Sequence, residues 1–193
     1  MSSQLIKEAA LKLFAENGYE GTSLAQIGEE IGMKKQSIYS HFTSKDDLFL
    51  AVLEDAFVVE QQHKQDYLKQ HLDEPLHDFL IKTLYRYIER FQDDNRLKFW
   101  LRVSFFPPAH LYEEVMNYLY RYIDQVDSLY LKRFQRAIEL NEIKKIEADT
   151  ANMAFSALID SICVELVYGG TERSEKKLQA AWQVYWAGIS SVS

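Results

Sequence analysis

The sequence predicts an all-α protein, because glycine and proline are rare and apolar residues recur at helical spacing. Between Gly32 and Gly169 the chain contains no other glycine and only three prolines. Residues that favour helices are common in this stretch, and apolar side chains return every three or four positions. No alternation of apolar and polar residues indicates a β-strand. We expect a head of three short helices and a body of about six longer ones.

Composition places the chain among globular proteins. Apolar residues make up 47% of the 193 residues, which excludes a disordered chain. No uninterrupted run of about twenty apolar residues is found, so we expect no membrane span. The N-terminus lacks the pattern of a signal peptide, and the single cysteine, Cys163, indicates a reducing compartment. We therefore expect a cytoplasmic protein.

Helix start and stop signals locate the elements of the head. The first helix is expected to begin after Ser2 or Ser3 and to end at Asn17-Gly18. Ser23 and Gln26 have the spacing of a capping box, which predicts the start of a second helix. Gly32 predicts a turn, and a short third helix follows it.

The same signals divide the body. Ser44 opens a long helix to about Leu72, and Pro75 begins a fifth helix. Asp93-Asp94-Asn95 caps a sixth helix, which Pro107-Pro108 ends. The remaining helices are expected at about 109–140, 149–168 and 171–189.

The segment with the clearest functional pattern covers residues 23–48, because it has the features of a helix-turn-helix. Two helices that cross steeply need a small residue where they touch, and Gly28 supplies it. The tight turn between them needs a residue that tolerates positive φ, and Gly32 supplies that. Five apolar residues can anchor the pair: Ile27, Ile31, Met33, Ile38 and Phe42.

This segment resembles the DNA-binding head of the TetR family of transcriptional regulators. The resemblance rests on FAENGY at 14–19, Thr22-Ser23, the run from Ile27 to Met33, and IYSHFTSKDDL at 38–48. It covers about the first quarter of the chain. This sequence has Gly28 where the family usually has alanine, Lys34 where a serine or threonine commonly caps the third helix, and Gln36 where a small residue is usual.

The resemblance implies which residues contact DNA. Phosphate contacts are implied for Thr22, Tyr39, His41 and Lys45, with Ser23 at the start of the second helix. The side chains implied to face the major groove are Lys35, Gln36, Ser37 and Ser40. Lys34 is a further candidate for holding phosphate. The net charge of −7 means that such binding must depend on a local basic surface.

The resemblance also implies how the whole chain works. Residues 1–46 are expected to form the DNA-binding domain, and 47–193 a ligand-binding and dimerisation domain. The expected partners are double-stranded operator DNA of palindromic sequence, a small apolar or lipophilic effector, and a second copy bound through the last two helices. The most direct interpretation is a repressor that the effector releases from DNA.

Aromatic residues are dense between residues 76 and 135, where they can form core or line a pocket. Two acids, Asp160 and Glu165, lie in an apolar stretch, so each is expected at a helix rim, paired across a dimer or facing a cavity. In a cavity, an acid would favour a lipophilic cation. The candidate effector residues are Trp100, Phe105, Tyr122 and Phe155, together with Asp160 and Glu165.

Motifs of enzymes are not found: the sequence has no glycine-rich phosphate loop, no G-x-S-x-G and no H-E-x-x-H. His63 and His71 share a helical face, but no third metal ligand is evident. We expect no catalytic residues, no metal and no cofactor. Two alternatives stay open: a helical adaptor whose head has lost operator binding, and an activator in place of a repressor.

Overall fold

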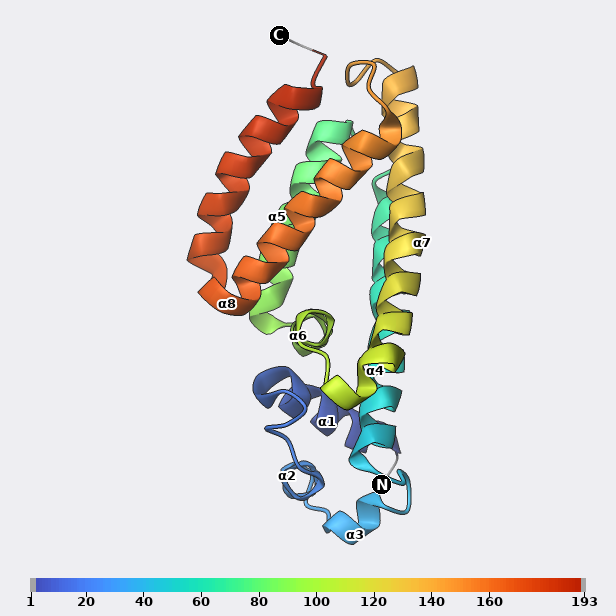
Figure 1. Ribbon diagram of the computed structural model, residues 1–193, viewed down its shortest axis with the longest axis vertical. Helices are drawn as coiled ribbons and strands as arrows, with labels where there is room; N and C mark the ends of the chain where they lie inside the picture. The colour runs from blue at the N-terminus through green and yellow to red at the C-terminus, as the bar shows by residue number, and fades with distance from the viewer. Residues whose placement is uncertain (1–2, 192–193) are drawn as a thin grey trace. The chain divides into compact units, whose positions relative to one another are not determined.

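The computed structural model describes residues 3–191, which form helices joined by short turns (Figure 1). Within this range the only β-pairing is an isolated antiparallel bridge between Ile143 and Ser190. The prediction of an all-α fold is confirmed. The helices are α1 (Ser3–Asn17), α2 (Leu24–Glu30), α3 (Lys35–Ile38), α4 (Lys45–Gln70), α5 (Leu76–Asp93), α6 (Asn95–Phe105), the 3₁₀ helix η1 (Ala109–Leu111), α7 (Tyr112–Glu139) and α8 (Ala148–Ile189).

The chain forms two compact units. The first contains the residues up to 60 together with 94–122, and the second contains 61–93 together with the residues from 123 onward. Both α4 and α7 run from one unit into the other, whereas α1, α2, α3 and α6 belong wholly to the first. The domain boundary expected after residue 46 stays a prediction.

Side-chain caps begin the helices where the sequence predicts them. Ser23 and Gln26 form a reciprocal capping box at α2: the Gln26 amide donates to Ser23 Oγ at 3.3 Å, and the Ser23 amide donates to Gln26 Oε1 at 2.8 Å. At α6, the Asp94 carboxylate accepts from the amides of Arg96 and Leu97. Each cap satisfies donors that the first helical turn leaves unpaired, so these boundaries follow from local chemistry.

Aromatic packing forms the core of the first unit. Phe14 of α1 meets Phe49 of α4 edge to face at 5.1 Å between ring centroids, and Phe49 meets Phe99 of α6 at 5.6 Å. Arg102 of α6 donates from Nε to the carbonyl of Ala15 at 3.0 Å, where the last carbonyls of α1 lack helical partners. The packing of α6 against α1 thus joins residues about 85 positions apart.

The second unit has its own aromatic core. Tyr130 of α7 packs against Phe79 of α5 at 5.7 Å and against Phe155 of α8 at 5.6 Å. Phe155 also contacts Phe134 at 6.3 Å. All four rings are buried, and the contact between α5 and α8 continues this core along the unit.

The break expected between 168 and 171 is confirmed, because the span labelled α8 consists of two helices that meet at a kink at Gly170, where φ is 76° and ψ is −179° (Figure 1). Glycine adopts this conformation without steric cost, so the chain turns and a further helix begins at once. The third helix is shorter than expected, because α3 ends at Ile38 and Phe42 lies in the turn that follows.

The apolar character of α8 bears on our expectation that no segment spans a membrane. One stretch of α8 has a mean hydropathy of 1.4 and is long and apolar enough to cross a bilayer by length and composition alone. Only 22% of this stretch is buried within the chain. The interface helix of an oligomer has the same composition, and α8 also contains the acids Asp160 and Glu165.

Candidate functional site

The turn between α2 and α3 brings the two helices into close contact at Gly28. A Cβ atom on Gly28 would lie 2.5 Å from the carbonyl oxygen of Met33, so a larger residue would push the backbones apart. The Gly28 carbonyl accepts from the Met33 amide at 2.7 Å, and Gly32 has φ of +66°. The structure therefore has the close pairing of two short helices that the two glycines predict.

Apolar anchors hold α3 against the rest of the head. Ile27 of α2 and Ile38 of α3 are both fully buried, and Phe42 is buried just beyond α3. Ile31 and Met33 are half-buried in the turn. Because these contacts use one side of α3, its other side remains open to solvent.

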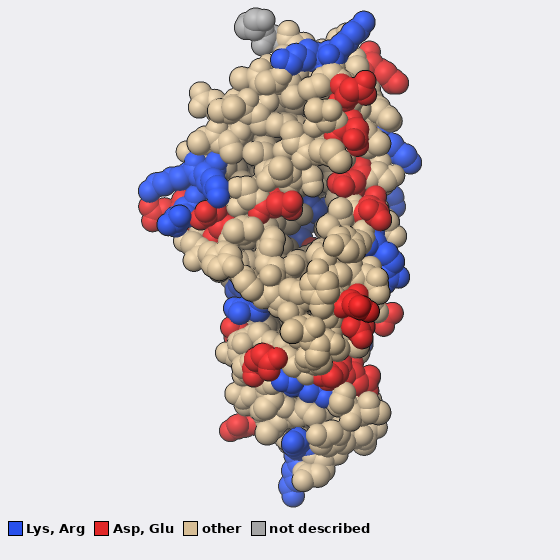
Figure 2. Space-filling model, in the orientation of Figure 1, with Lys and Arg blue, Asp and Glu red and all other residues tan. Residues whose placement is uncertain are grey.

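The exposed side of α3 carries most of the predicted DNA-binding residues. Residues 31–45 contain three lysines and no acid, which makes this edge basic in a chain of net charge −7. Figure 2 shows basic side chains protruding from the surface where Figure 1 places α3. Seven predicted residues on α3 or directly beside it are exposed: Lys34, Lys35, Gln36, Ser37, Tyr39, Ser40 and His41.

Local contacts order some of these side chains. Ser40 Oγ donates to the carbonyl of Ser37 at 2.7 Å, and Lys35 Nζ lies 5.8 Å from the centroid of the Tyr39 ring. Lys34 is the N-cap residue of α3 and makes no side-chain cap, as its departure from the family pattern predicts. Its ammonium group extends from the start of the helix.

An open hollow of about 380 Å³ lies where the start of α2, α3 and the start of α4 meet. Five of its lining residues are predicted DNA-binding residues, and four are not. One of these four, Ser44, was predicted only as the start of a helix. The lining residues are Glu20, Thr22, Ser23, Leu24, Lys35, Tyr39, Thr43, Ser44 and Lys45.

Two of the predicted phosphate contacts are engaged inside the head. Thr22 is 2% exposed, and its hydroxyl is within hydrogen-bond distance of the carbonyls of Gly18 (2.8 Å) and Leu13 (3.1 Å). Lys45 Nζ donates to the carbonyls of Tyr19 at 2.9 Å and Thr22 at 3.1 Å. Both side chains hold the turn between α1 and α2 in place.

A second group of polar side chains also holds this part of the head together. These residues were not among the contacts predicted from the sequence. The Tyr19 hydroxyl donates to Asp46, and His110 Nε2 lies 3.3 Å from the same carboxylate. The pKa of Asp46 lies below its ordinary value. The hydrogen bond from Tyr19 is the main cause, and the hydrogen bond from His110 contributes less. Asp46 and His110 are 64 positions apart, so no local pattern could have paired them.

The candidate effector residues fall into different surroundings. Trp100 and Tyr122 pack edge to face at 5.0 Å in the first unit, and both are buried. Phe105, at the end of α6, is half-buried. Phe155 lies in the core of the second unit, with Tyr185 at 6.0 Å.

The two candidate acids on α8 also differ. Glu165 accepts from Lys177 at 3.0 Å and from Arg173 at 3.2 Å, and these partners lower its pKa. Asp160 is exposed as a whole residue, but neighbouring atoms remove part of the hydration of its carboxylate. This desolvation, together with the negative charge of Asp127, raises the pKa of Asp160. Glu165 is therefore a structural ion-pair residue in this chain.

Metal ligands do not gather in the described part of the chain: residues 3–191 contain no group of three or more His, Cys, Asp or Glu side chains able to hold an ion. His71, one of two histidines considered above, instead lies 3.0 Å from Glu74 on the next turn.

Comparisons with known proteins agree with this geometry. The sequence model described as "Bacterial regulatory proteins, tetR family" matches residues 6–52. A curated relative, the biofilm operon icaADBC HTH-type negative transcriptional regulator IcaR of Staphylococcus epidermidis, is 29% identical over 117 residues, which span 59% of each chain.

Solved structures extend the likeness of fold to the whole chain. SmeT, described as the repressor of a Stenotrophomonas maltophilia multidrug efflux pump, gives a TM-score of 0.74 at 17% identity and covers 100% of this chain and 92% of its own. A putative transcriptional regulator from Saccharomonospora viridis, in complex with choline, gives 0.76 at 18% identity and covers 98% and 97%. Residues 6–52 are thus similar to the TetR family of bacterial regulatory proteins, and the fold of the whole chain is similar to that of solved transcriptional regulators such as SmeT.

Proposed function

We propose that this protein is a repressor that binds a palindromic operator as a dimer and is released by a small apolar effector. The observation that carries the proposal is the exposed, basic outer side of α3, held in place by the buried anchors Ile27 and Ile38. A helix presented in this way can enter the major groove. IcaR is described as a negative regulator and SmeT as a repressor, which supports repression over activation.

Within the head we assign phosphate contacts to Lys34, Tyr39 and His41, and also to Lys35, which the resemblance had placed at the major groove. All four are exposed along one edge, and Lys35 and Tyr39 also line the hollow beside α4. Cations and hydroxyl groups along such an edge can follow the phosphate backbone of a duplex.

Base recognition is assigned to Gln36, Ser37 and Ser40. Their exposed amide and hydroxyl groups can donate to base edges and accept from them. We assign an indirect role to Thr22, Ser23 and Lys45, because groups of these residues already form hydrogen bonds within the head. These bonds hold the DNA-contacting residues in position.

Selection of bound DNA from a random pool, using the full-length protein, tests the proposal. We expect a site with two-fold symmetry, and a gel-shift titration with that site should show saturable binding that weakens steeply as salt rises. A recovered pool without any shared sequence would contradict the proposal and favour the adaptor alternative. Reporter output from the selected site, with and without the gene, separates repressor from activator.

Variants of neighbouring residues test the division of roles on α3. Lys35→Ala should weaken binding to all sequences alike and reduce the slope of log affinity against log salt by about 1. Gln36→Ala should change the preferred bases, at a cost of about 1–3 kcal/mol for the favoured site. Lys145→Ala, which removes an exposed lysine outside the head, is the matched control. Equal changes in base preference from Lys35→Ala and Gln36→Ala would refute the assignment.

Dimerisation is assigned to α8. Large apolar side chains of this helix are exposed in the single chain, including Met153 at 65%, Tyr168 at 69% and Val184 at 75%. A second copy of α8 would cover such a face, as in a four-helix interface with two-fold symmetry. We assign α8 to this interface and not to a membrane span, and we propose that the protein acts in the cytoplasm.

Effector release is assigned to α4. This helix starts in the head at Lys45, and its last turns belong to the second unit, so a shift of α4 would move the head. A dimer whose two heads no longer match successive grooves would lose one set of contacts. Structures of the free and effector-bound dimer with the same head separation and mobility would contradict this mechanism.

A further inference from the structure

The segment formed by α6 and η1, residues 95–111, contacts the head at two separate points. This segment follows the domain boundary expected after residue 46, yet it lies in the same compact unit as α1, α2 and α3. Arg102 of α6 makes the first contact, with the end of α1, and His110 of η1 makes the second, with the start of α4. These contacts link the head to a part of the chain that is far from it in sequence.

Arg102 supplies a polar cap for the end of α1. The last turn of α1 contains no basic residue, and the final carbonyl groups of a helix have no helical partners. Arg102 Nε donates to the carbonyl of Ala15 at 3.0 Å, and its Nη2 donates to the carbonyl of Glu16 at 3.3 Å. Charge-assisted bonds from one planar guanidinium group to two carbonyls restrict both the position and the rotation of the helix end.

His110 contacts the start of α4 and the turn after α1. Its Nε2 lies 3.3 Å from Asp46 Oδ1, and its ring lies 5.2 Å from the Tyr19 ring between centroids. The Tyr19 hydroxyl donates to the same carboxylate, and Lys45 Nζ lies 3.8 Å from the centroid of the Tyr19 ring. The turn after α1, the start of α4 and η1 therefore meet in one cluster of polar and aromatic side chains.

The chain between the two contacts has little conformational freedom. The rings of Pro107 and Pro108 restrict φ, which is −57° at Pro108, and Pro108 is buried. The Phe106 amide donates to the carbonyl of Arg102 at 2.8 Å, and the Leu111 amide donates to the carbonyl of Pro108 at 3.0 Å. The two contact points are thus joined by a segment that holds them at a fixed separation.

Apolar packing also attaches the head, but it restricts direction less. Phe14 of α1 lies 6.3 Å from Phe99 of α6 between ring centroids. The hydrophobic effect has no preferred direction, whereas hydrogen bonds weaken steeply when their angles change. The apolar core therefore keeps the head attached, and the two polar contacts set its orientation.

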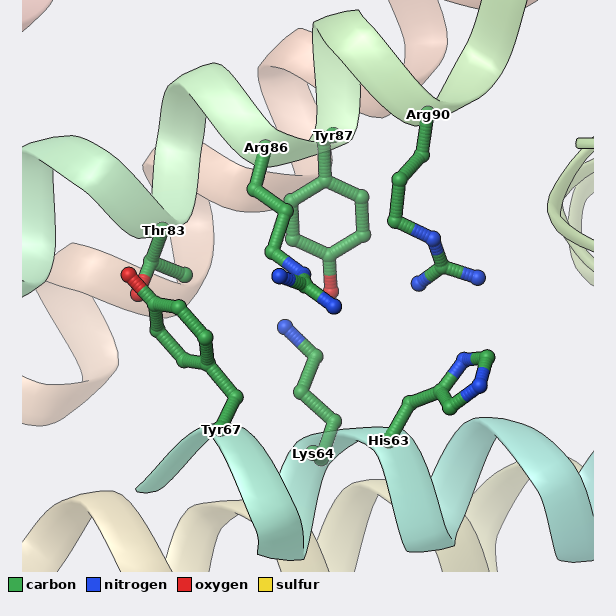
Figure 3. Close-up of a pocket in the computed structure, with 7 residues that line it drawn as sticks. All are labelled: His63, Lys64, Tyr67, Thr83, Arg86, Tyr87 and Arg90. Atoms are coloured by element: carbon green, nitrogen blue, oxygen red, sulfur yellow. The ribbon is translucent and has the colours of Figure 1, made fainter. Parts of the chain in front are cut away.

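The far end of α4 is held by different contacts within the second unit. Lys64 Nζ lies 4.2 Å from the centroid of the Tyr87 ring, and the guanidinium carbon of Arg86 lies 5.0 Å from the centroid of the Tyr67 ring. Figure 3 shows these side chains between α4 and α5. They fix the last turns of α4, and they leave the orientation of the head to contacts within the first unit.

We propose that Arg102 and His110 are positioning residues, which orient each head and thereby set the spacing of the two half-sites that the dimer accepts. The inference rests on the proposed function, since it concerns how the dimer meets a palindromic operator. One base pair added between the half-sites moves the second by about 3.4 Å and turns it by about 35° around the duplex. A head held at two points cannot follow this change, whereas a head without these contacts can turn toward the displaced groove.

Fluorescence anisotropy with the full-length protein tests the inference. The probes are the selected operator and two versions with one base pair more or one fewer at the centre. We expect the parent protein to prefer the selected spacing by about tenfold or more. In the double variant Arg102→Gln, His110→Ala, affinity for the selected spacing should fall and the preference should shrink to about threefold or less, because at least three hydrogen bonds are lost.

The ratio of affinities separates positioning from stability. A role in folding alone would lower the affinity for every spacing by the same factor, and an unchanged preference would overturn the inference. Equal affinity of the parent protein for all three spacings would overturn it as well. Arg136→Gln, which removes an arginine bonded to Asp73 in the second unit, is the control and should keep the preference of the parent protein. His110→Ala alone changes an exposed side chain, so it provides the same test if the double variant does not fold.

Distances between the two heads separate this inference from the proposed function. A spin label at Glu29→Cys, on the exposed side of α2, reports the head separation in the free dimer, since the native Cys163 is only 3% exposed. We expect a narrow distance distribution in the parent protein and a clearly broader one in the double variant. If the distribution broadens although no operator is found, the proposed function fails and the positioning role stands. If the operator binds but neither the distribution nor the spacing preference changes, the positioning role fails and the DNA-binding function stands.

Discussion

At the start of α4, a few polar side chains hold separate parts of the head together. Asp46 accepts from Tyr19, in the turn after α1, and approaches His110 in η1 at 3.3 Å. Lys45 lies 3.8 Å from the centroid of the Tyr19 ring and bonds to two carbonyls of the same turn. The Tyr19 ring is thus held by a cation at its face and an anion at its hydroxyl, which fixes the first residues of α4.

The pH dependence of stability follows from Asp46. Its pKa is below the ordinary value of 3.8 in the folded protein, chiefly because Tyr19 donates to the carboxylate. A carboxyl group with a depressed folded pKa contributes stability above its unfolded pKa, and this contribution is lost as pH falls through the folded value. Asp46→Asn should therefore lower the melting temperature at pH 7, with the difference from the parent protein shrinking below about pH 4.

Thermal melts between pH 7 and pH 2.5 measure this effect. Asp93→Asn, which changes an exposed carboxylate at the end of α5, is the control and should change the melting temperature little at any pH. A constant difference between Asp46→Asn and the parent protein across the whole range would show that the carboxylate charge plays no part.

At the scale of elements, the head depends on two glycines with different roles. Gly28 has no room for a Cβ, since that atom would lie 2.5 Å from the Met33 carbonyl oxygen. Gly32 has open space around it, but its φ of +66° is unfavourable for residues with a side chain. The first restriction comes from a tertiary contact and the second from the backbone alone.

These roles predict different responses to substitution. Gly32→Ala should destabilise the head by about 1–2 kcal/mol, and Gly32→Asn by less, because asparagine tolerates positive φ. Gly28→Ala should weaken operator binding as well as stability, because relief of the clash with Met33 displaces α3. Denaturant melts and gel shifts check both. Full operator affinity in Gly28→Ala would show that α2 and α3 can separate without functional loss.

Caps and turns could be predicted because their partners are close in sequence. Ser23 and Gln26 are three residues apart, as are Asp94 and Leu97, so each cap is visible as a short pattern. The kink within α8 could be predicted in the same way, because the glycine pair at 169 and 170 usually ends a helix. The end of α3 could not, because Phe42, which was expected in this helix, lies in the turn after it.

For the whole molecule, the exposed apolar face of α8 predicts the assembly. Val184→Asp should convert the dimer to a monomer, because burying an unpaired carboxylate costs several kcal/mol, and operator binding should fall with it. Light scattering after size-exclusion chromatography measures the mass. Gln179→Asp adds the same charge at an exposed position of α8 on a different side of the helix, and should leave the dimer intact. A dimer of unchanged stability in Val184→Asp would contradict the assignment of α8.

The sequence by itself determined the all-α fold, the position of the head and the two short helices around Gly28 and Gly32. Helical periodicity, caps and turn residues act over a few positions, so they can be read directly. Only the tertiary structure decided that Lys45 bonds inside the head, and that His110 approaches Asp46 from 64 positions away. Periodicity predicts which face of a helix is apolar, but the element that this face meets depends on packing between segments far apart in the chain.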